Sequence, residues 1–258
     1  MRLSALLLSG LIWAGAQAAF AHDTFFLPAP PTPEGELVLD LGSATHFPTL
    51  ETPVRAERAV GLQVRQGGAP LEWRAEGGPT ALRIFVARPA PSDEAVVARI
   101  AFAPRDIDVP PAEVAEYMGE IGADPEVRAA FEAAAARDGV TRETYAKTVK
   151  AYVCAAACRV DDSPSEGGAL EFFPVGQGAF VLHRAEAPVA GQAVFLSTQS
   201  GERHALVTDL QGRVAIPAEA SGTVLLTAVV LRPPASEGAR FTSEWAALTF
   251  TAGTIRAR

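Results

Sequence analysis

The residues with the clearest capacity for chemistry are two histidines near the start of the chain, His22 and His46. Imidazole nitrogen is a good ligand for Ni, Co and Cu in nitrogen-rich sites. His22 follows Ala19-Phe20-Ala21, which has the small residues of a signal-peptide cleavage site. Cleavage there would give His22 a free amine, so that its amine and ring could bind one metal ion together. The sequence therefore predicts a transition-metal site at His22, with His46 as a further ligand.

The position of the cut decides this chemistry, and the sequence leaves it open. Residues 1–21 have the layout of a signal peptide: a basic start, a short apolar run and small residues before the cut. A competing motif, Ala16-Gln17-Ala18, would leave His22 in fourth place with no special geometry. A cut after Ala19 would give Phe20-Ala21-His22, a chelate suited to square-planar Cu(II) or Ni(II), but it puts a large glutamine where a small residue is wanted.

Cys154 and Cys158 are the only cysteines of the chain. Export would place them in an oxidising compartment, where a disulfide is the usual state. Such a bridge fits poorly inside a continuous helix, so we expect the helix to end near Cys154 and the three alanines between the cysteines to form a loop. A paired thiolate metal site is the alternative, and the spacing does not match covalent haem attachment.

The other reactive side chains show no catalytic motif. The sequence has no Gly-x-Ser-x-Gly elbow, no His-Glu-x-x-His helix and no Gly-rich phosphate loop. We expect His183 and His204 at the surface, and Trp73 and Trp245 in the core rather than as sugar-binding platforms. The pair Asp161-Asp162 lies in a segment rich in Ser and Gly, which is typical of solvated charge.

The composition restricts the class of protein. The chain has 258 residues, 48% hydrophobic and 20% charged, as expected of a globular protein that buries a core. A net charge of −8 without a basic patch argues against nucleic acid or anionic lipid as a partner. No later apolar stretch reaches the roughly 20 residues that a membrane span needs. We therefore expect a soluble, periplasmic protein after removal of the signal peptide.

Three zones follow residues 1–21: 22–108, 109–160 and 165–253. Short apolar runs broken by Pro and Gly predict a β-sandwich unit in the first zone and an immunoglobulin-like or transthyretin-like sandwich in the last. The expected strands span 36–41, 59–64, 81–87 and 95–102 in the first zone, and 180–184, 193–197, 204–208, 213–217, 223–231 and 245–250 in the last. The fold class is therefore mainly β.

The middle zone is predicted to be a helical insert between the two units. Helical spacing of apolar residues follows Pro111. Asp124-Pro125-Glu126 is an N-cap with proline in the first turn, and Gly139 ends that run. A third helix is expected from Thr141, with an apolar stripe of core residues formed by Tyr145, Val149 and Tyr152.

Several motifs occur in an order that carries a family resemblance. They are Ala21-His22-Asp23, Thr45-His46-Phe47-Pro48, Thr141-Arg142-Glu143-Thr144-Tyr145-Ala146-Lys147, the segments 188–194 and 208–213, and the closing Trp245-Ala246-Ala247-Leu248-Thr249-Phe250. Together they resemble a family of exported bacterial proteins of unknown function, which includes NikM-like periplasmic components of nickel and cobalt uptake transporters.

The resemblance implies a ligand set for a metal. Family members commonly carry a histidine just after the signal peptide and another in a Gly-His-Phe-like segment, which His22 and His46 match. Many carry a third in the penultimate strand, where residues 226–231 of this chain contain none.

Three functions are consistent with these features. The first is a non-enzymatic periplasmic accessory protein that binds Ni, Co or Cu, with a transporter component as its partner. The second is an envelope binding or scaffold module that holds no metal. The third is an oxidative copper enzyme built on the amino-terminal histidine.

Overall fold

The computed structural model describes residues 22–162, 168–176, 178–236 and 238–256, and the expected signal peptide lies outside them. These residues form mainly β-strands with two α-helices, which confirms the mainly-β fold class. None of the helices in the described part is both long and apolar enough to cross a bilayer.

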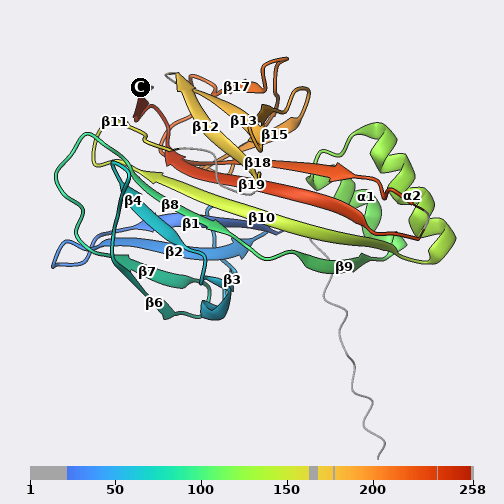
Figure 1. Ribbon diagram of the computed structural model, residues 1–258, viewed down its shortest axis with the longest axis horizontal. Coiled ribbons are helices and arrows are strands. Elements are labelled where there is room, and N and C mark those ends of the chain that lie inside the picture. Colours follow the sequence, from blue (N-terminus) through green and yellow to red (C-terminus); the bar gives the residue numbers. More distant parts are fainter. Residues whose placement is uncertain (1–21, 163–167, 177, 237, 257–258) are drawn as a thin grey trace, which may run out of the picture.

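A nine-stranded sheet forms the centre of the molecule (Figure 1). Its order is β16-β15-β18-β19-β10-β8-β4-β5, and β9 also pairs with β10. The strands are β4 (Gln63–Gln66), β5 (Ala69–Pro70), β8 (Val96–Ala101), β9 (Arg105–Val109), β10 (Thr141–Val153), β15 (Ala193–Thr198), β16 (Arg203–Val207), β18 (Thr223–Arg232) and β19 (Phe241–Thr251). This central sheet therefore draws strands from all three zones of the sequence, and β10 joins the first zone to the last.

Smaller sheets complete the β-structure. One consists of β1 (Asp23–Ala29), β2 (Leu37–Ala44), β3 (Thr52–Pro53), β6 (Trp73–Gly77) and β7 (Leu82–Val86). Another consists of β12 (Leu170–Gly176), β13 (Ala179–Arg184), β14 (Ala187–Pro188) and β17 (Arg213–Ala215). β11 (Cys158–Arg159) pairs with β20 (Ile255–Arg256).

The two smaller sheets cover opposite faces of the central sheet. Successive side chains of a strand point to opposite faces. Accordingly, Leu225 and Ala247 pack in the core under β1, β2 and β7, whereas their neighbours Leu226 and Leu248 pack in the core under β12 and β13. Both faces of the central strands are buried, so their sequences are apolar without a clean alternation.

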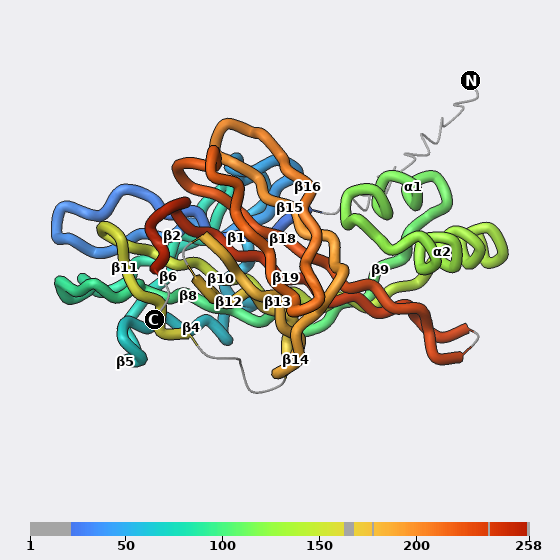
Figure 2. Tube along the Cα trace, turned by 90° about the horizontal axis from the view of Figure 1, so that it is seen from above, coloured from blue at the N-terminus to red at the C-terminus, as the bar shows by residue number. Residues whose placement is uncertain are grey.

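The helices cover one end of the central sheet, beyond the layer formed by β1, β2 and β7 (Figures 1 and 2). α1 (Pro111–Glu120) begins at Pro111, as expected. α2 (Pro125–Asp138) has both predicted ends: Asp124 accepts hydrogen bonds from the amides of Glu126 and Val127, and Gly139 takes a left-handed φ of 73°. A core of Met118, Phe131 and their neighbours packs them on β18 and β19.

The predicted third helix from Thr141 is wrong, because this segment is strand β10. It pairs parallel with β19 and antiparallel with β8 and β9. Thr, Val and Tyr are frequent here and favour strands. The strand was not recognised because two of its buried residues, Glu143 and Lys150, are charged. A strand buried on both faces is normally apolar.

Lys150 is buried in an ionic network between the central sheet and β12. Its ammonium contacts the carboxylates of Asp162 and Glu171, and Arg99 Nη2 lies 2.7 Å from Glu171 Oε1. Tyr152 donates to Asp162 at 2.6 Å. The expectation that Asp161-Asp162 is merely solvated is therefore wrong for Asp162, whose side chain is 7% exposed.

Most other strand predictions are confirmed within a few residues. The exception among them is 59–64, most of which lies between the short 3-10 helix (Ala56–Arg58) and β4. Strands β1, β6 and β12 were not predicted. The disulfide between Cys154 and Cys158 is confirmed, and it closes a loop of three alanines that follows a strand rather than a helix.

Candidate ligand-binding site

A cavity of about 660 Å³ lies on the central sheet, between the layer that contains β1 and the helices. Its base is formed by Tyr145 and Lys147 of β10 and by Trp245 of β19. Strand β1 packs over β10 and β19, so its first residues form one wall. The cavity therefore occupies the gap between two covering layers of one sheet.

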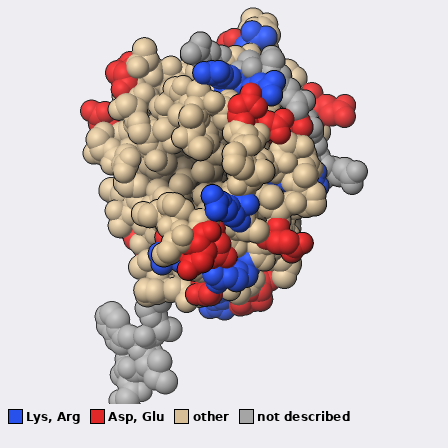
Figure 3. All heavy atoms as spheres, turned by 90° about the vertical axis from the view of Figure 1, so that its left-hand side faces the viewer, with Lys and Arg blue, Asp and Glu red and all other residues tan. Residues whose placement is uncertain are grey.

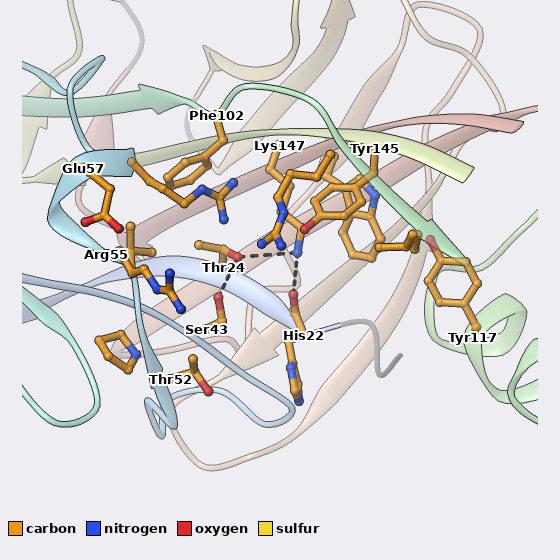
Figure 4. Close-up of a pocket in the computed structure, with 16 residues that line it drawn as sticks. His22, Thr24, Ser43, Thr52, Arg55, Glu57, Phe102, Tyr117, Tyr145 and Lys147 are labelled. Atoms are coloured by element: carbon orange, nitrogen blue, oxygen red, sulfur yellow. Dashed lines mark hydrogen bonds between the residues drawn. The ribbon is translucent and has the colours of Figure 1, made fainter. Parts of the chain in front are cut away.

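Four cationic side chains line this cavity: Arg55, Arg58, Arg105 and Lys147. The arginines come from the segment around the 3-10 helix and from the first residue of β9. No described acidic side chain forms an ion pair with any of the three arginines. Glu57 is the acidic residue among the described lining residues (Figure 4). The cavity therefore carries an excess of positive charge in an acidic protein.

Lys147 is held at the base of the cavity by β1 and by an aromatic ring. Its Nζ donates to the carbonyl oxygen of His22 at 2.6 Å and lies 3.5 Å from Thr24 Oγ1 (Figure 4). It also lies 4.3 Å from the centre of the Trp245 ring, as in a cation–π contact. Burial lowers the pKa of Lys147 to about 8, with Asp23 opposing the shift, so the amine still binds a proton at neutral pH.

Trp245 and Tyr117 are fixed by a buried hydrogen-bond chain. Trp245 Nε1 donates to Ser243 Oγ at 2.9 Å, and the Ser243 hydroxyl contacts Glu143. Tyr117 donates to the same carboxylate at 2.9 Å. Burial raises the pKa of Glu143 and raises that of Tyr117 well above its usual value. These hydrogen bonds connect α1 to β10 and β19, and they orient two aromatic residues of the cavity.

His22 lies at the wall of this cavity, at the point where β1 begins. Its carbonyl points toward Lys147, whereas its ring points away from it (Figure 4). Its Nε2 lies 4.0 Å from Glu51 Oε2, and Glu51 in turn accepts a hydrogen bond from the Thr45 amide at 3.3 Å. Strand β1 pairs with β2, and Phe25 of β1 lies opposite Gly42 of β2.

His46 lies on the other side of β1. It lines a second, smaller cavity together with Asp23, which is the residue after His22. Across the described residues, no group of three or more His, Cys, Asp and Glu side chains is arranged to hold a metal ion. His22 and His46 line different cavities, and the metal site expected from the sequence stays a prediction.

The other two histidines are less exposed than expected. His183 and His204 are half-buried, and His183 Nδ1 and His204 Nε2 have no hydrogen-bond partner among the described residues. Burial lowers the pKa of His183, which favours its neutral form. Trp245 is buried, as predicted.

Sequence reasoning missed the cationic cavity. Its arginines lie in short irregular segments or at a strand end, and Lys147 lies in a segment predicted to be helical. The available signal was the spacing of Arg55 and Arg58, two cations three residues apart.

The comparisons with known proteins give no family for this chain. No protein-family model matches it, and a search of curated proteins finds no significant match.

Proposed function

We propose that this chain is a binding protein whose larger cavity takes a small organic anion with an aromatic or apolar body. The observation that carries this proposal is the set of three arginines without acidic partners, together with Lys147, around one cavity. Charged groups that face a cavity without partners favour a ligand of opposite charge. A chain with a net charge of −8 would otherwise repel anions.

The lining also sets the shape of the ligand. Phe102, Tyr145 and Trp245 provide aromatic surface beside the cations, so the body of the ligand can be apolar. A volume of about 660 Å³ is within the usual range for sites of small molecules. Arginine binds carboxylates and phosphates in a bidentate manner, so a carboxylate or phosphate is the expected anionic group.

The test is calorimetric titration with benzoate and phthalate, with neutral benzamide as the matched ligand control. We expect both anions to bind, phthalate more tightly, and benzamide to bind at least about tenfold more weakly. Arg58→Gln and Arg105→Gln should each lower the affinity for phthalate by about tenfold. Arg65→Gln, which changes an exposed arginine of β4 outside the cavity, should leave the affinity unchanged. Equal binding of benzamide and benzoate would overturn the proposal.

A second candidate function is the metal handling that the sequence suggests. We propose that an exported, processed form with His22 at its amino terminus binds Ni, Co or Cu as a transport accessory protein. What supports this proposal is the place of His22, at the wall of a cavity and with Glu51 Oε2 4.0 Å from its Nε2. His46 is one residue beyond Thr45, whose amide binds that same carboxylate.

Native mass spectrometry of the exported protein tests this second candidate, with and without added Ni(II), Co(II) and Cu(II). A chain that begins at His22 and retains one metal ion, and that loses it on His22→Ala or His46→Ala, would support it. A different first residue, or no retained metal, would contradict the metal-handling function and leave anion binding as the proposed function.

A further inference from the structure

A second cavity, of about 290 Å³, lies across β1 from the first one. Its described lining includes Asp23 of β1, the turn after β2, the end of α1, and residues of β15, β16 and β18. Trp245 lines both cavities, and Asp23 faces this one whereas His22 and Thr24 face the other. The first residues of β1 therefore separate two cavities of different charge.

Asp23 is the notable group of the second cavity. Its carboxylate accepts no hydrogen bond and forms no ion pair with any described residue. Asp23 is half-buried. A carboxylate that loses part of its hydration without gaining a partner costs free energy unless a ligand satisfies it.

One cation, Arg203, lines this cavity, and its guanidinium is engaged with two other lining residues. Arg203 Cζ lies 3.7 Å from the centre of the Phe195 ring, and its Nη2 donates to the carbonyl oxygen of Glu120 at 2.7 Å. It forms no ion pair with Asp23 among the described contacts. Lys147 donates to the backbone of β1 on the other side. Asp23 is therefore left for a group that enters the cavity.

Aromatic rings complete the lining. Phe47, Phe195 and Trp245 face the same cavity as Asp23, together with the apolar side chains of Ile121 and Val229. An ammonium group is attracted both by a carboxylate and by the faces of aromatic rings. A neutral donor can also bind a carboxylate, but a hydrogen bond from a charged donor is stronger.

We propose that this second cavity binds a small organic ammonium, with Asp23 as its counter-ion and the aromatic rings around its apolar substituent. The site is distinct from the anion cavity, because the charged groups that define each one do not line the other. Its volume of about 290 Å³ suits a small amine.

The test is titration of the full protein with benzylammonium at about pH 7.5, where this amine is charged. Benzyl alcohol has the same shape without the charge and is the matched ligand control. We expect benzylammonium to bind at least about tenfold more tightly than the alcohol. Asp23→Asn keeps the side-chain shape and should abolish this preference.

Two further variants keep the result interpretable. Phe195→Leu should lower the affinity for benzylammonium several-fold while leaving Asp23 in place. Asp93→Asn removes an exposed carboxylate paired with Arg159 and should change nothing. Phthalate binding by each variant shows that the neighbouring cavity is still folded.

The outcomes separate this proposal from the others. Equal affinity for the amine and the alcohol, or an affinity unchanged by Asp23→Asn, would overturn it. Binding of Ni(II) that requires Asp23 and His46, with no binding of benzylammonium, would also overturn it and would assign the cavity to a metal ion. Failure of phthalate to bind would affect only the function proposed for the larger cavity.

Discussion

Asp23 and Lys147 are the two charged residues on which the two proposed binding sites depend most. They lie on opposite sides of the first residues of β1, each in a different cavity, and each affects the pKa of the other. Burial makes the charged form of both less favourable. Residues that cost stability without an evident structural gain are common at binding sites.

Replacement of Asp23 tests this cost directly. Because the pKa of Asp23 is raised from 3.8 to about 6, the folded state binds a proton more tightly than the unfolded state between these values. The charged form therefore destabilises the fold above about pH 6, and the penalty disappears as the pH falls toward 4. We expect Asp23→Asn to stabilise the protein by about 1–3 kcal/mol at neutral pH.

The measurement is urea unfolding of wild type and Asp23→Asn across this pH range. The difference in free energy of unfolding should shrink below about pH 6 and be small near pH 4. The groups that face Asp23 are Lys147, Arg203 and Glu120, so a variant at Lys147 is a useful companion. A difference that does not change with pH would contradict the assignment.

Among the elements, α1 depends on the hydrogen-bond chain through Glu143. Tyr117→Phe removes its bond to the buried carboxylate and leaves a cavity residue of nearly the same shape. We expect a loss of about 1–3 kcal/mol in unfolding free energy, since a buried charged acceptor loses a partner. Thermal or chemical unfolding measures this loss. An unchanged stability would mean that the hydrogen bonds to Glu143 contribute nothing to the docking of α1.

The turn after α1 gives a second prediction, with a matched control. Gly122 has a φ of 61°, and a Cβ there would lie 2.8 Å from Ala193 Cβ and 3.0 Å from Phe195 Cζ. Gly122→Ala should therefore destabilise the fold by about 1–3 kcal/mol. Gly119→Ala, inside α1 with open space around it, should stabilise by about 0.5–1 kcal/mol. Equal effects of the two substitutions in unfolding experiments would contradict this reading of the turn.

The elements also show what sequence reasoning can reach. α2 was predictable because Asp124 and Gly139 are local signals that do not depend on distant contacts. β10 was not, because Glu143 and Lys150 belong in a buried strand only when partners from β19, α1 and β12 are present. The cavity was unpredictable for the same reason, since Arg58, Arg105 and Lys147 are far apart in sequence and meet through strand pairing and through the packing of β1.

At the scale of the whole molecule, one long sheet carries both cavities. Strands β10 and β19 run from the covering layers to the helices (Figure 1), and the part between β1 and the helices forms the cavity floor. Acidic and basic side chains lie next to one another on the end opposite the helices (Figure 3). The concentration of cations around the larger cavity therefore contrasts with the mixed charge of that end and with the acidic balance of the chain.

The central claim is that an organic anion binds among these cations. The most direct measurement is a crystal structure with 4-bromobenzoate, in which the anomalous signal of bromine locates the ligand. We expect a bromine peak beside Trp245, with the carboxylate directed at Arg58 or Arg105. Bromine found only elsewhere on the protein, or no bound ligand at saturating concentration, would contradict it.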